Sequence, residues 1–241
     1  MSQSDASIAC SRCNDLRQRT GSTHCWSTDL EHRPPAPAYC PSRLHEGVAR
    51  EAFATYTDDG IDAHMARVAA RVEGMGYEPS VGSDAVHPRW TRVEETVAFA
   101  KLMGYRRLGI ATCLGLLDES SRLTAILEGQ GFEVLSVCCK TGSIDKLALG
   151  LNEEDKVLPG TFEPACNPIA QARMLNASHS QMNLIVGLCV GHDMLFTKHS
   201  EAPVTTLVTK DRVTGHNPVS VLYGQNFYYR RLQSQPVDVG E

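Results

Sequence analysis

The sequence predicts an α/β fold in which a mostly parallel, Rossmann-like sheet carries flanking helices and follows a small cysteine-rich lobe. After Gly104, apolar strand-like runs alternate with helical periods, and three amphipathic helical periods precede that glycine. Residues 1–42 show neither period but contain four cysteines. We therefore expect a metal-binding lobe over residues 1–42 and an α/β domain with N-terminal helices over residues 43–241.

Composition and charge limit the classes of function. The chain has 241 residues, a formal net charge of −5 and a pI near 6.0, and its basic residues are spread rather than clustered. Such a surface argues against nucleic-acid binding, and no apolar run reaches the roughly 18 residues that a membrane span needs. No P-loop, G-x-G-x-x-G loop or G-x-S-x-G elbow supports nucleotide or serine-hydrolase chemistry. We expect a cytoplasmic protein that acts with a small-molecule substrate or an electron-transfer partner.

Three helices are expected before the sheet. The first starts at Ser42, where apolar residues recur about every 3.6 positions, and ends before the Asp58-Asp59-Gly60 turn. The second helix runs from about residue 61 to about residue 74. The third runs from Pro88, a residue favoured in the first turn of a helix, to Gly104, a residue favoured just past its end.

Four strands are expected after Gly104, at about residues 107–112, 132–138, 183–190 and 204–209. A helix at about residues 118–130 joins the first two strands and makes a βαβ unit. A further helix begins at Asn167-Pro168, with Asn167 as its N-cap and Pro168 in its first turn. Since crossovers between parallel strands are right-handed, the carboxyl ends of these strands should lie on one edge of the sheet.

Thiols gather at the predicted strand ends. Nine cysteines are an odd number for a disulfide framework, and the polar N-terminus shows no export signal, so metal or thiol chemistry is the better explanation. Cys113, Cys139 and Cys189 each follow an apolar run. Cys166 lies just before the Asn-Pro helix start, a position that lowers the pKa of a thiol. We expect these four thiols to bind one cofactor, whereas Cys138 should face the opposite side because neighbouring side chains of a strand alternate.

An iron–sulfur cluster, of the [4Fe–4S] type, is the cofactor that this pattern favours. Lys140 and Lys210 lie near the predicted thiolates and would offset the negative charge of such a cluster. Zinc is the alternative, since cysteine-rich sites also select that ion, and a site with one open position is catalytic in form. A third reading is a metal-free redox site that uses the Cys138-Cys139 pair or a Cys166 thiolate.

Ionisable groups follow the last two predicted strands. His192 or His216 would move protons at the open position of the centre, while Lys210 or Arg212 would hold an anionic group of the substrate. The abundance of such groups favours an enzyme with redox or sulfur-handling chemistry. The alternative is a non-catalytic metalloprotein for electron transfer, metal sensing or delivery, in which these side chains only orient the metal ligands.

The N-terminal lobe should also hold a metal ion. A segment of this length and composition buries little apolar surface, so ligand bonds would take the place of the missing core. The Cys10-x2-Cys13 spacing suits two thiolates on one ion, because a tight turn between them points both sulfurs inward.

Several motifs occur together in this chain, namely the N-terminal cysteines, C-C-K-x-G, C-N-P, G-L-C-V-G-H-D and K-D-R-x-x-G-H-N-P. In these motifs it resembles an uncharacterised prokaryotic family of predicted metal-binding proteins with four N-terminal cysteines, and the similarity covers nearly the whole chain. The family has no settled reaction. The resemblance implies metal ligation by Cys10, Cys13, Cys25 and Cys40. His24 is the substitute for Cys25, because the 11 residues between Cys13 and Cys25 are a long spacing for that pattern.

Overall fold

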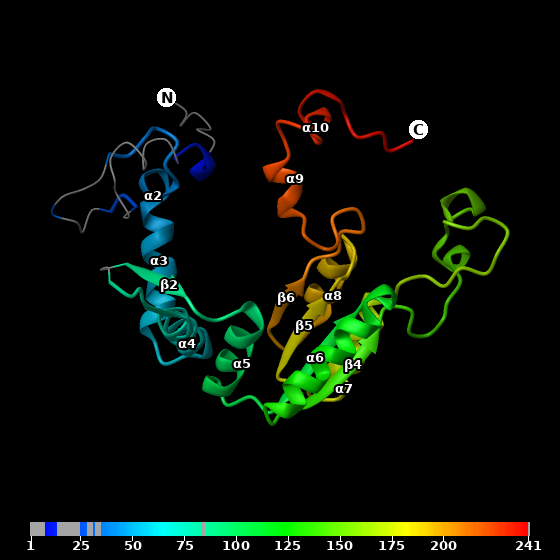
Figure 1. Cartoon of the computed structure of the whole chain (residues 1–241), viewed down its shortest axis with the longest axis horizontal. Coiled ribbons are helices and arrows are strands. Elements are labelled where there is room, and N and C mark those ends of the chain that lie inside the picture. The colour runs from blue at the N-terminus through cyan, green and yellow to red at the C-terminus, as the bar shows by residue number, and fades with distance from the viewer. Residues whose placement is uncertain (1–7, 14–24, 28–30, 32–34, 83–84, 241) are drawn as a thin grey trace. The chain divides into compact units, whose positions relative to one another are not determined.

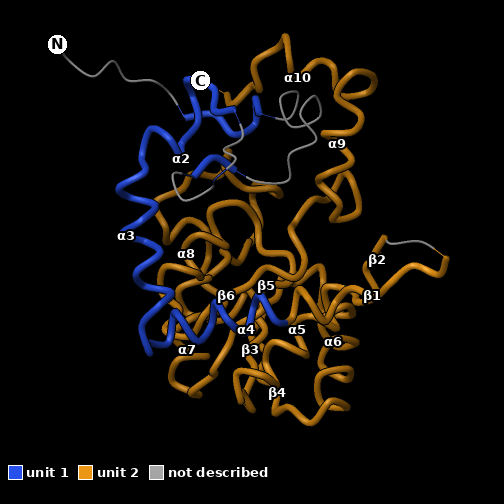
Figure 2. The backbone as a smooth tube through the Cα atoms, turned by 90° about the vertical axis from the view of Figure 1, so that its left-hand side faces the viewer, with its two compact units in different colours: residues 1–71 blue, residues 72–241 orange. Residues whose placement is uncertain are grey.

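A computed structural model of the chain describes residues 8–13, 25–27, 31, 35–82 and 85–240 (Figure 1). The chain divides into two compact units, residues 1–71 and residues 72–241 (Figure 2). The first unit contains the cysteine-rich segment together with the helices that follow it. That residues 1–42 form a separate metal-binding lobe remains a prediction.

The first unit is helical. A 3-10 helix, η1 (Cys10–Cys13), is followed by α2 (Pro41–Leu44), α3 (Glu46–Thr57) and most of α4 (Ile61–Met75). The helix expected from Ser42 is present, but it forms as α2 and α3 with His45 between them. The helix expected over residues 61–74 is α4, within one residue at its end.

A short hairpin and one helix open the second unit. Strands β1 (Tyr77–Pro79) and β2 (Val86–Pro88) pair antiparallel, and α5 (Arg92–Leu102) follows. The prediction of a helix starting at Pro88 is therefore wrong, because Pro88 ends β2 and Thr91 caps the helix. The Thr91 hydroxyl accepts a hydrogen bond from the Glu94 N–H at 3.4 Å, and the Glu94 carboxylate accepts one from the Thr91 N–H at 2.7 Å. This capping box satisfies two of the free N–H groups at the helix start.

The second unit is an α/β structure built on a four-stranded sheet that is parallel throughout, which confirms the predicted fold class at that level. The strand order is β4-β3-β5-β6. The strands and their connecting helices are β3 (Arg107–Thr112), η2 (Leu114–Leu116), α6 (Leu117–Gly129), β4 (Glu133–Cys138), α7 (Pro168–Ala177), β5 (Met182–Val186), α8 (His192–His199) and β6 (Val204–Val208).

One strand is shorter than the sequence predicts. Strand β5 ends at Val186 rather than near residue 190, because Gly187 has a φ of +72° and turns the chain out of the sheet. A Cβ at Gly187 would lie 1.9 Å from Cδ1 of Leu116, so the chain after β3 packs directly against this turn. The residues that follow β3 and β5 are thereby brought together.

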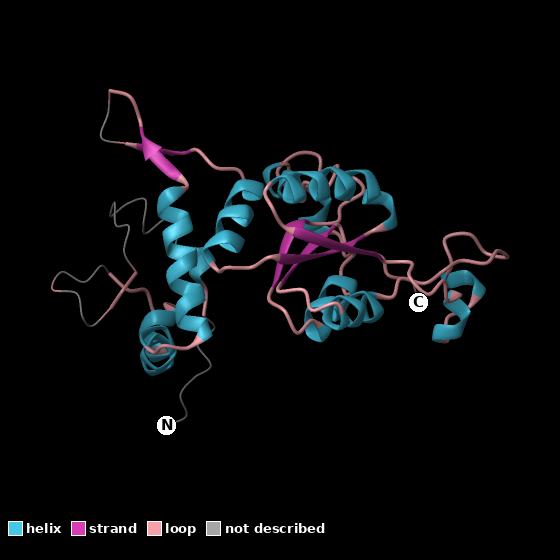
Figure 3. Ribbon diagram, turned by 90° about the horizontal axis from the view of Figure 1, so that it is seen from below, coloured by secondary structure: helices cyan, strands magenta, loops and turns pink. Residues whose placement is uncertain are grey.

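Helices cover both faces of the sheet (Figure 3). On one face, Leu123 and Leu127 of α6 and Ala100 of α5 pack with Leu108 and Leu184 of the central strands. On the other face lie Ala172 and Leu175 of α7 and Phe196 of α8, packed with Ala111 and Ile185. These two apolar clusters fix the sheet between its helices, and so they fix the position of every strand end.

A long loop connects β4 to α7 and contains the 3-10 helices η3 (Lys146–Leu149) and η4 (Glu153–Asp155) (Figure 1). The Lys156 side chain is only 2% exposed, and its ammonium lies 2.9 Å from Glu153 Oε1 and 3.4 Å from Asp145 Oδ1. An isolated bridge pairs Asp145 with Pro164. These contacts close the loop and return the chain to the end of β4.

The chain after the sheet forms two short helices, α9 (Val219–Tyr223) and α10 (Arg231–Ser234). Several large apolar side chains of this segment are exposed, among them Phe227 and Tyr228. In the described part of the chain, no helix combines the length and the apolar character that crossing a membrane requires.

Candidate cysteine site at the carboxyl edge of the sheet

Four cysteines lie at the carboxyl edge of the parallel sheet. Cys113 directly follows β3, Cys139 directly follows β4, and Cys189 lies in the turn after β5. The Cys113 N–H donates to the Val186 carbonyl at 3.1 Å, and the Cys139 N–H donates to the Thr112 carbonyl at 2.8 Å. The hydrogen-bonded ladder therefore continues past the strands and holds these turns beside one another.

Cys166 reaches the same edge from the long loop. It precedes Asn167, whose side chain caps α7 by accepting a hydrogen bond from the Ala170 N–H at 3.1 Å. The Asn167 N–H donates to the Cys139 carbonyl at 2.7 Å, and the Lys140 ammonium donates to the Pro164 carbonyl at 2.5 Å. The start of α7 is thus bound to the end of β4.

Cys139 and Cys166 interact through their side chains. The hydrogen bond that Cys139 donates to the Cys166 sulfur lowers the pKa of Cys166 to about 5, and the charges of Lys140 and His192 lower it further against the opposing effect of burial. The same hydrogen bond and burial raise the pKa of Cys139, which is 2% exposed. Cys139 is therefore the thiol of the pair and Cys166 the thiolate.

The lowered pKa of Cys166 agrees in direction with the sequence-based prediction, but its main cause is different. The sequence points to the helix N-terminus as the cause, whereas the largest effect comes from Cys139. The residue that supplies it is separated from Cys166 by the whole loop between β4 and α7. No local sequence pattern predicts the interaction between Cys139 and Cys166.

Arg212 joins the site through Cys189. Its Nη2 donates a hydrogen bond to Cys189 Sγ at 3.1 Å. The pKa of Arg212 is raised first by this hydrogen bond and by the charge of Cys189, and further by the charges of Cys113 and Cys166. Three of the four predicted cofactor ligands thus lie near enough to Arg212 to act on it electrostatically. The sequence predicts for Arg212 only the role of holding a substrate anion, as an alternative to Lys210.

The Cys139 sulfur also has a backbone partner. The Leu114 N–H, in the first turn of η2, donates to Cys139 Sγ at 3.3 Å. Hydrogen bonds from backbone N–H groups to sulfur stabilise thiolates and metal-bound thiolates alike. The turn after β3 therefore contributes a donor as well as Cys113.

The predicted catalytic residues occupy different places around this edge. His192 is the first residue of α8, and it acts on Cys166 through its charge. The Lys210 side chain crosses the ends of β5 and β3, since a Cβ on Gly187 would lie 3.7 Å from its Cδ and one on Gly115 would lie 3.4 Å from its Nζ. Among the interactions of the described residues, none gives the Lys210 ammonium a hydrogen-bond or ion-pair partner, so it is available to an anion.

His216 is held by the turn that follows β6. Its φ is +67°, its N–H donates to the Asp211 carbonyl at 2.7 Å, and its Nδ1 accepts from the Asp211 N–H at 3.1 Å. In the neutral ring the proton is therefore on Nε2. The described contacts connect His216 to Asp211 and to none of the four cysteines.

The N-terminal cysteines are brought partly together. Cys10 and Cys13 are the two ends of η1, and the Ala9 N–H donates to the Tyr39 carbonyl at 3.2 Å, which places η1 beside the segment that contains Cys40. Cys25 is exposed, and its substitute His24 lies outside the described residues. The structure leaves these ligand assignments as predictions.

Neither set of cysteines forms a ready ligand cage. Across residues 8–13, 25–27, 31, 35–82 and 85–240, no three side chains of His, Cys, Asp or Glu converge closely enough to hold a metal ion. Binding of an ion at the sheet edge would require rotation of side chains, because the Cys189 sulfur now contacts Arg212 instead of another cysteine.

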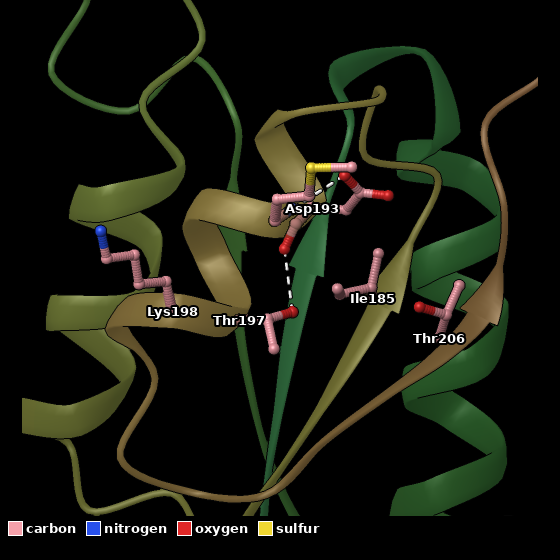
Figure 4. A pocket seen from close by; sticks show the side chains of 6 residues that line it. Ile185, Asp193, Thr197, Lys198 and Thr206 are labelled. Atoms are coloured by element: carbon pink, nitrogen blue, oxygen red, sulfur yellow. Dashed lines mark hydrogen bonds between the residues drawn. The ribbon is translucent and has the colours of Figure 1, made fainter. Parts of the chain in front are cut away.

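An open depression lies beside α8, which the sequence did not predict. It has a volume of about 380 Å³, and Figure 4 shows its lining by Ile185, Asp193, Met194, Thr197, Lys198 and Thr206. The Thr197 hydroxyl donates to the Asp193 carbonyl at 2.8 Å, so part of its polar lining is already paired. None of the four edge cysteines lines it.

This chain matches a protein family and is similar to an archaeal protein. Residues 40–207 match a family described as "Protein of unknown function (DUF1847)". The uncharacterized protein MJ0455 of Methanocaldococcus jannaschii is 47% identical over 142 residues, which make up 59% of this chain and 71% of that protein. The family match includes all four edge cysteines and begins at Cys40.

Proposed function

This chain belongs to the DUF1847 family of proteins of unknown function, and from that premise we propose that it is a metal-binding protein with a thiolate-held centre at the carboxyl edge of its sheet. The proposed centre is an iron–sulfur cluster, with zinc as the alternative metal. Its ligands are Cys113, Cys139, Cys166 and Cys189.

The placement of four cysteines at the carboxyl edge of the sheet carries this proposal, together with the 3.1 Å hydrogen bond from Arg212 to Cys189. Thiolates gathered at one place repel one another unless cations offset their charge, and here Arg212, Lys140 and His192 surround them. Soft thiolate ligands select iron–sulfur clusters and zinc over harder cations. The donor set therefore fits the centre chemically, and completing it requires the Cys189 sulfur to leave its contact with Arg212.

The topology of the sheet supports the same location. In the order β4-β3-β5-β6, the chain leaves β3 toward one side and later continues from β5 toward the other. Open α/β sheets bind ligands outside the carboxyl ends of their strands at such a switch point. Cys113 follows β3 and Cys189 follows β5, so they flank it. The finer description of the fold as Rossmann-like belongs to this proposal.

We propose that the protein is an enzyme that acts on a small molecule by redox or sulfur-handling chemistry. A bound cluster would supply electron transfer or a Lewis-acidic position. Lys210 would hold an anionic group of the substrate, because its ammonium is not engaged by the described residues. His192 and His216 would move protons, the latter from its Nε2.

A non-catalytic role is the second candidate. In that role the protein would take part in electron transfer, metal sensing or delivery, and the partner would be another protein. Reduced thiols at such a site suit the cytoplasm, which we propose as the location. The N-terminal set, Cys10, Cys13, Cys25 and Cys40, would hold a second ion in either case.

Anaerobic purification tests the proposal. Analysis of iron, zinc and acid-labile sulfide, together with an absorption spectrum, separates the two metals. We expect the Cys189→Ala variant to lose the cluster bands and the corresponding metal, whereas Cys138→Ala should retain both. Full metal loading of Cys189→Ala would contradict the ligand assignment, and absence of both sulfide and cluster bands from the wild-type protein would contradict the cluster.

A further inference from the structure

Cys139 and Cys166 are held near each other by two hydrogen bonds, one between backbone groups and one from a lysine side chain. The Asn167 N–H donates to the Cys139 carbonyl at 2.7 Å, and the Lys140 ammonium donates to the Pro164 carbonyl at 2.5 Å. The loop between them is closed by the buried Lys156 contacts. The fold itself therefore holds the two cysteines next to each other.

Their side chains meet as well. Cys166 packs against the buried apolar cluster that contains the Cys139 side chain, and the interaction between the two thiols is the largest influence on the pKa of each. A disulfide needs a Cα separation of about 4.4–6.8 Å, and the 2.7 Å hydrogen bond from the Asn167 N–H to the Cys139 carbonyl holds the two segments side by side. Both thiols are free in the structure.

The two thiols differ in access. Cys139 is 2% exposed, whereas Cys166 is partly exposed and has the Lys140 ammonium beside it. This is the arrangement of an attacking thiolate and a buried resolving thiol. Cys138, the last residue of β4, is not among the groups that shift the pKa of Cys166, so Cys139 is the assigned partner.

We propose that Cys139 and Cys166 form a reversible dithiol–disulfide pair that exchanges with low-molecular-weight disulfides. The pair needs no metal, so the inference stands apart from the proposed centre. Where a metal is bound at the edge, formation of the disulfide removes two of its four ligands. The redox state of the pair would then control whether the site can bind the metal.

The exchange proceeds in two steps. The Cys166 thiolate attacks one sulfur of R–S–S–R, which forms the Cys166–S–S–R mixed disulfide and releases RS⁻. That RS⁻ takes the proton of Cys139 and leaves as RSH. The Cys139 thiolate, stabilised by the Leu114 N–H at 3.3 Å, attacks the Cys166 sulfur of the mixed disulfide and releases the second RS⁻. The dithiol is oxidised and the small disulfide is reduced by the same electron pair.

Mass spectrometry of the metal-stripped, reduced full chain after treatment with oxidised glutathione tests this pair. Trypsin places Cys139 in the peptide of residues 123–140 and Cys166, as the sole cysteine, in the peptide of residues 157–173. We expect these two peptides to be linked by a disulfide in the wild-type protein and to separate again on reduction with dithiothreitol. A link from either peptide to Cys113 or Cys189 instead, or no link in the folded protein, would overturn the proposal.

Variants identify the roles of the two thiols. Cys139→Ser should lose the link and accumulate glutathione on Cys166, because the resolving thiol is gone. Cys138→Ser, the matched control in the same peptide, should keep the link. Retention of the link in Cys139→Ser would show that Cys138 is the partner and the assignment is wrong. The untreated protein could contain the metal and yet form no such link after the metal is removed. That result would support the proposed centre and reject the disulfide pair.

Discussion

At the scale of single residues, the cysteine site is governed by neighbours that lie far away in the sequence. Cys166 owes its lowered pKa first to Cys139 and then to Lys140, both in the turn after β4, and to His192 at the start of α8. Arg212, which follows β6, donates a hydrogen bond to the Cys189 sulfur at 3.1 Å. Lys140, His192 and Arg212 therefore interact with cysteine side chains. The Lys210 ammonium has no hydrogen-bond or ion-pair partner among the described residues, so it is available to a substrate.

Replacement of Lys140 should raise the pKa of Cys166 in the metal-free protein. The change Lys140→Met removes a nearby positive charge and a hydrogen bond, each of which favours the thiolate, so the midpoint of Cys166 alkylation should move up by about one pH unit. The rate of iodoacetamide labelling of the 157–173 peptide against pH measures it. Lys210→Met is the matched control, because Lys210 is not among the groups that shift Cys166. An unchanged midpoint in Lys140→Met would contradict this cause.

At the scale of elements, the turns after the strands are shaped by close packing. Gly187 ends β5 with a φ of +72°, and its missing Cβ leaves room for Leu116 and for the stem of Lys210. The apolar pattern of residues 183–190 continues past this point, which is why the sequence predicts a longer strand. A strand length read from apolar residues alone misses a glycine that turns the chain.

Gly187→Ala should destabilise the protein more than an equally strained glycine elsewhere. The new Cβ would meet Leu116 Cδ1 at 1.9 Å in a left-handed backbone, which together cost about 2–5 kcal/mol of unfolding free energy. Gly104→Ala is the control, since its φ is +73° but no atom lies within 4 Å of its Cβ. It should cost only about 1–2 kcal/mol. Equal shifts of the two urea midpoints would show that packing at Gly187 has no effect.

At the scale of the whole molecule, chemistry is divided between two compact units. Residues 1–71 contain Cys10, Cys13, Cys25 and Cys40, and residues 72–241 contain the other five cysteines. The predicted N-terminal ion and the proposed edge centre therefore belong to different units. Each should be removable without the other.

Replacement of Cys10 and Cys13 by Ser should remove about one metal equivalent, because both thiolates of the C-x2-C turn are lost. The absorption of the edge centre should remain, since none of its ligands has changed. Metal analysis and the spectrum of the double variant, with Cys138→Ser measured alongside, check this expectation. Unchanged metal content would mean that these cysteines hold no ion, and loss of the edge-centre bands as well would mean that the two sites depend on each other.

The α/β fold class, the approximate positions of the four parallel strands and the edge at which Cys113, Cys139 and Cys189 lie could be predicted from the sequence. These features follow from local periodicity and from the rule that parallel strands share a carboxyl edge, so short segments are sufficient to predict them. Even small details were predictable in this way, such as Asn167 as the cap of α7. The start of α5 was placed wrongly at Pro88, although the Thr91-x-x-Glu94 capping box that begins the helix is a local signal in the sequence.

Which side chains meet at that edge could not be predicted from the sequence. In the folded chain Cys139 interacts with Cys166 across the closed loop, and Arg212 contacts Cys189. The Lys210 ammonium has no partner among the described residues. The physical reason is that such contacts join segments far apart in the chain. They depend on how the loop after β4 closes around Lys156 and how each turn packs on its neighbour, and no local period of the sequence encodes either.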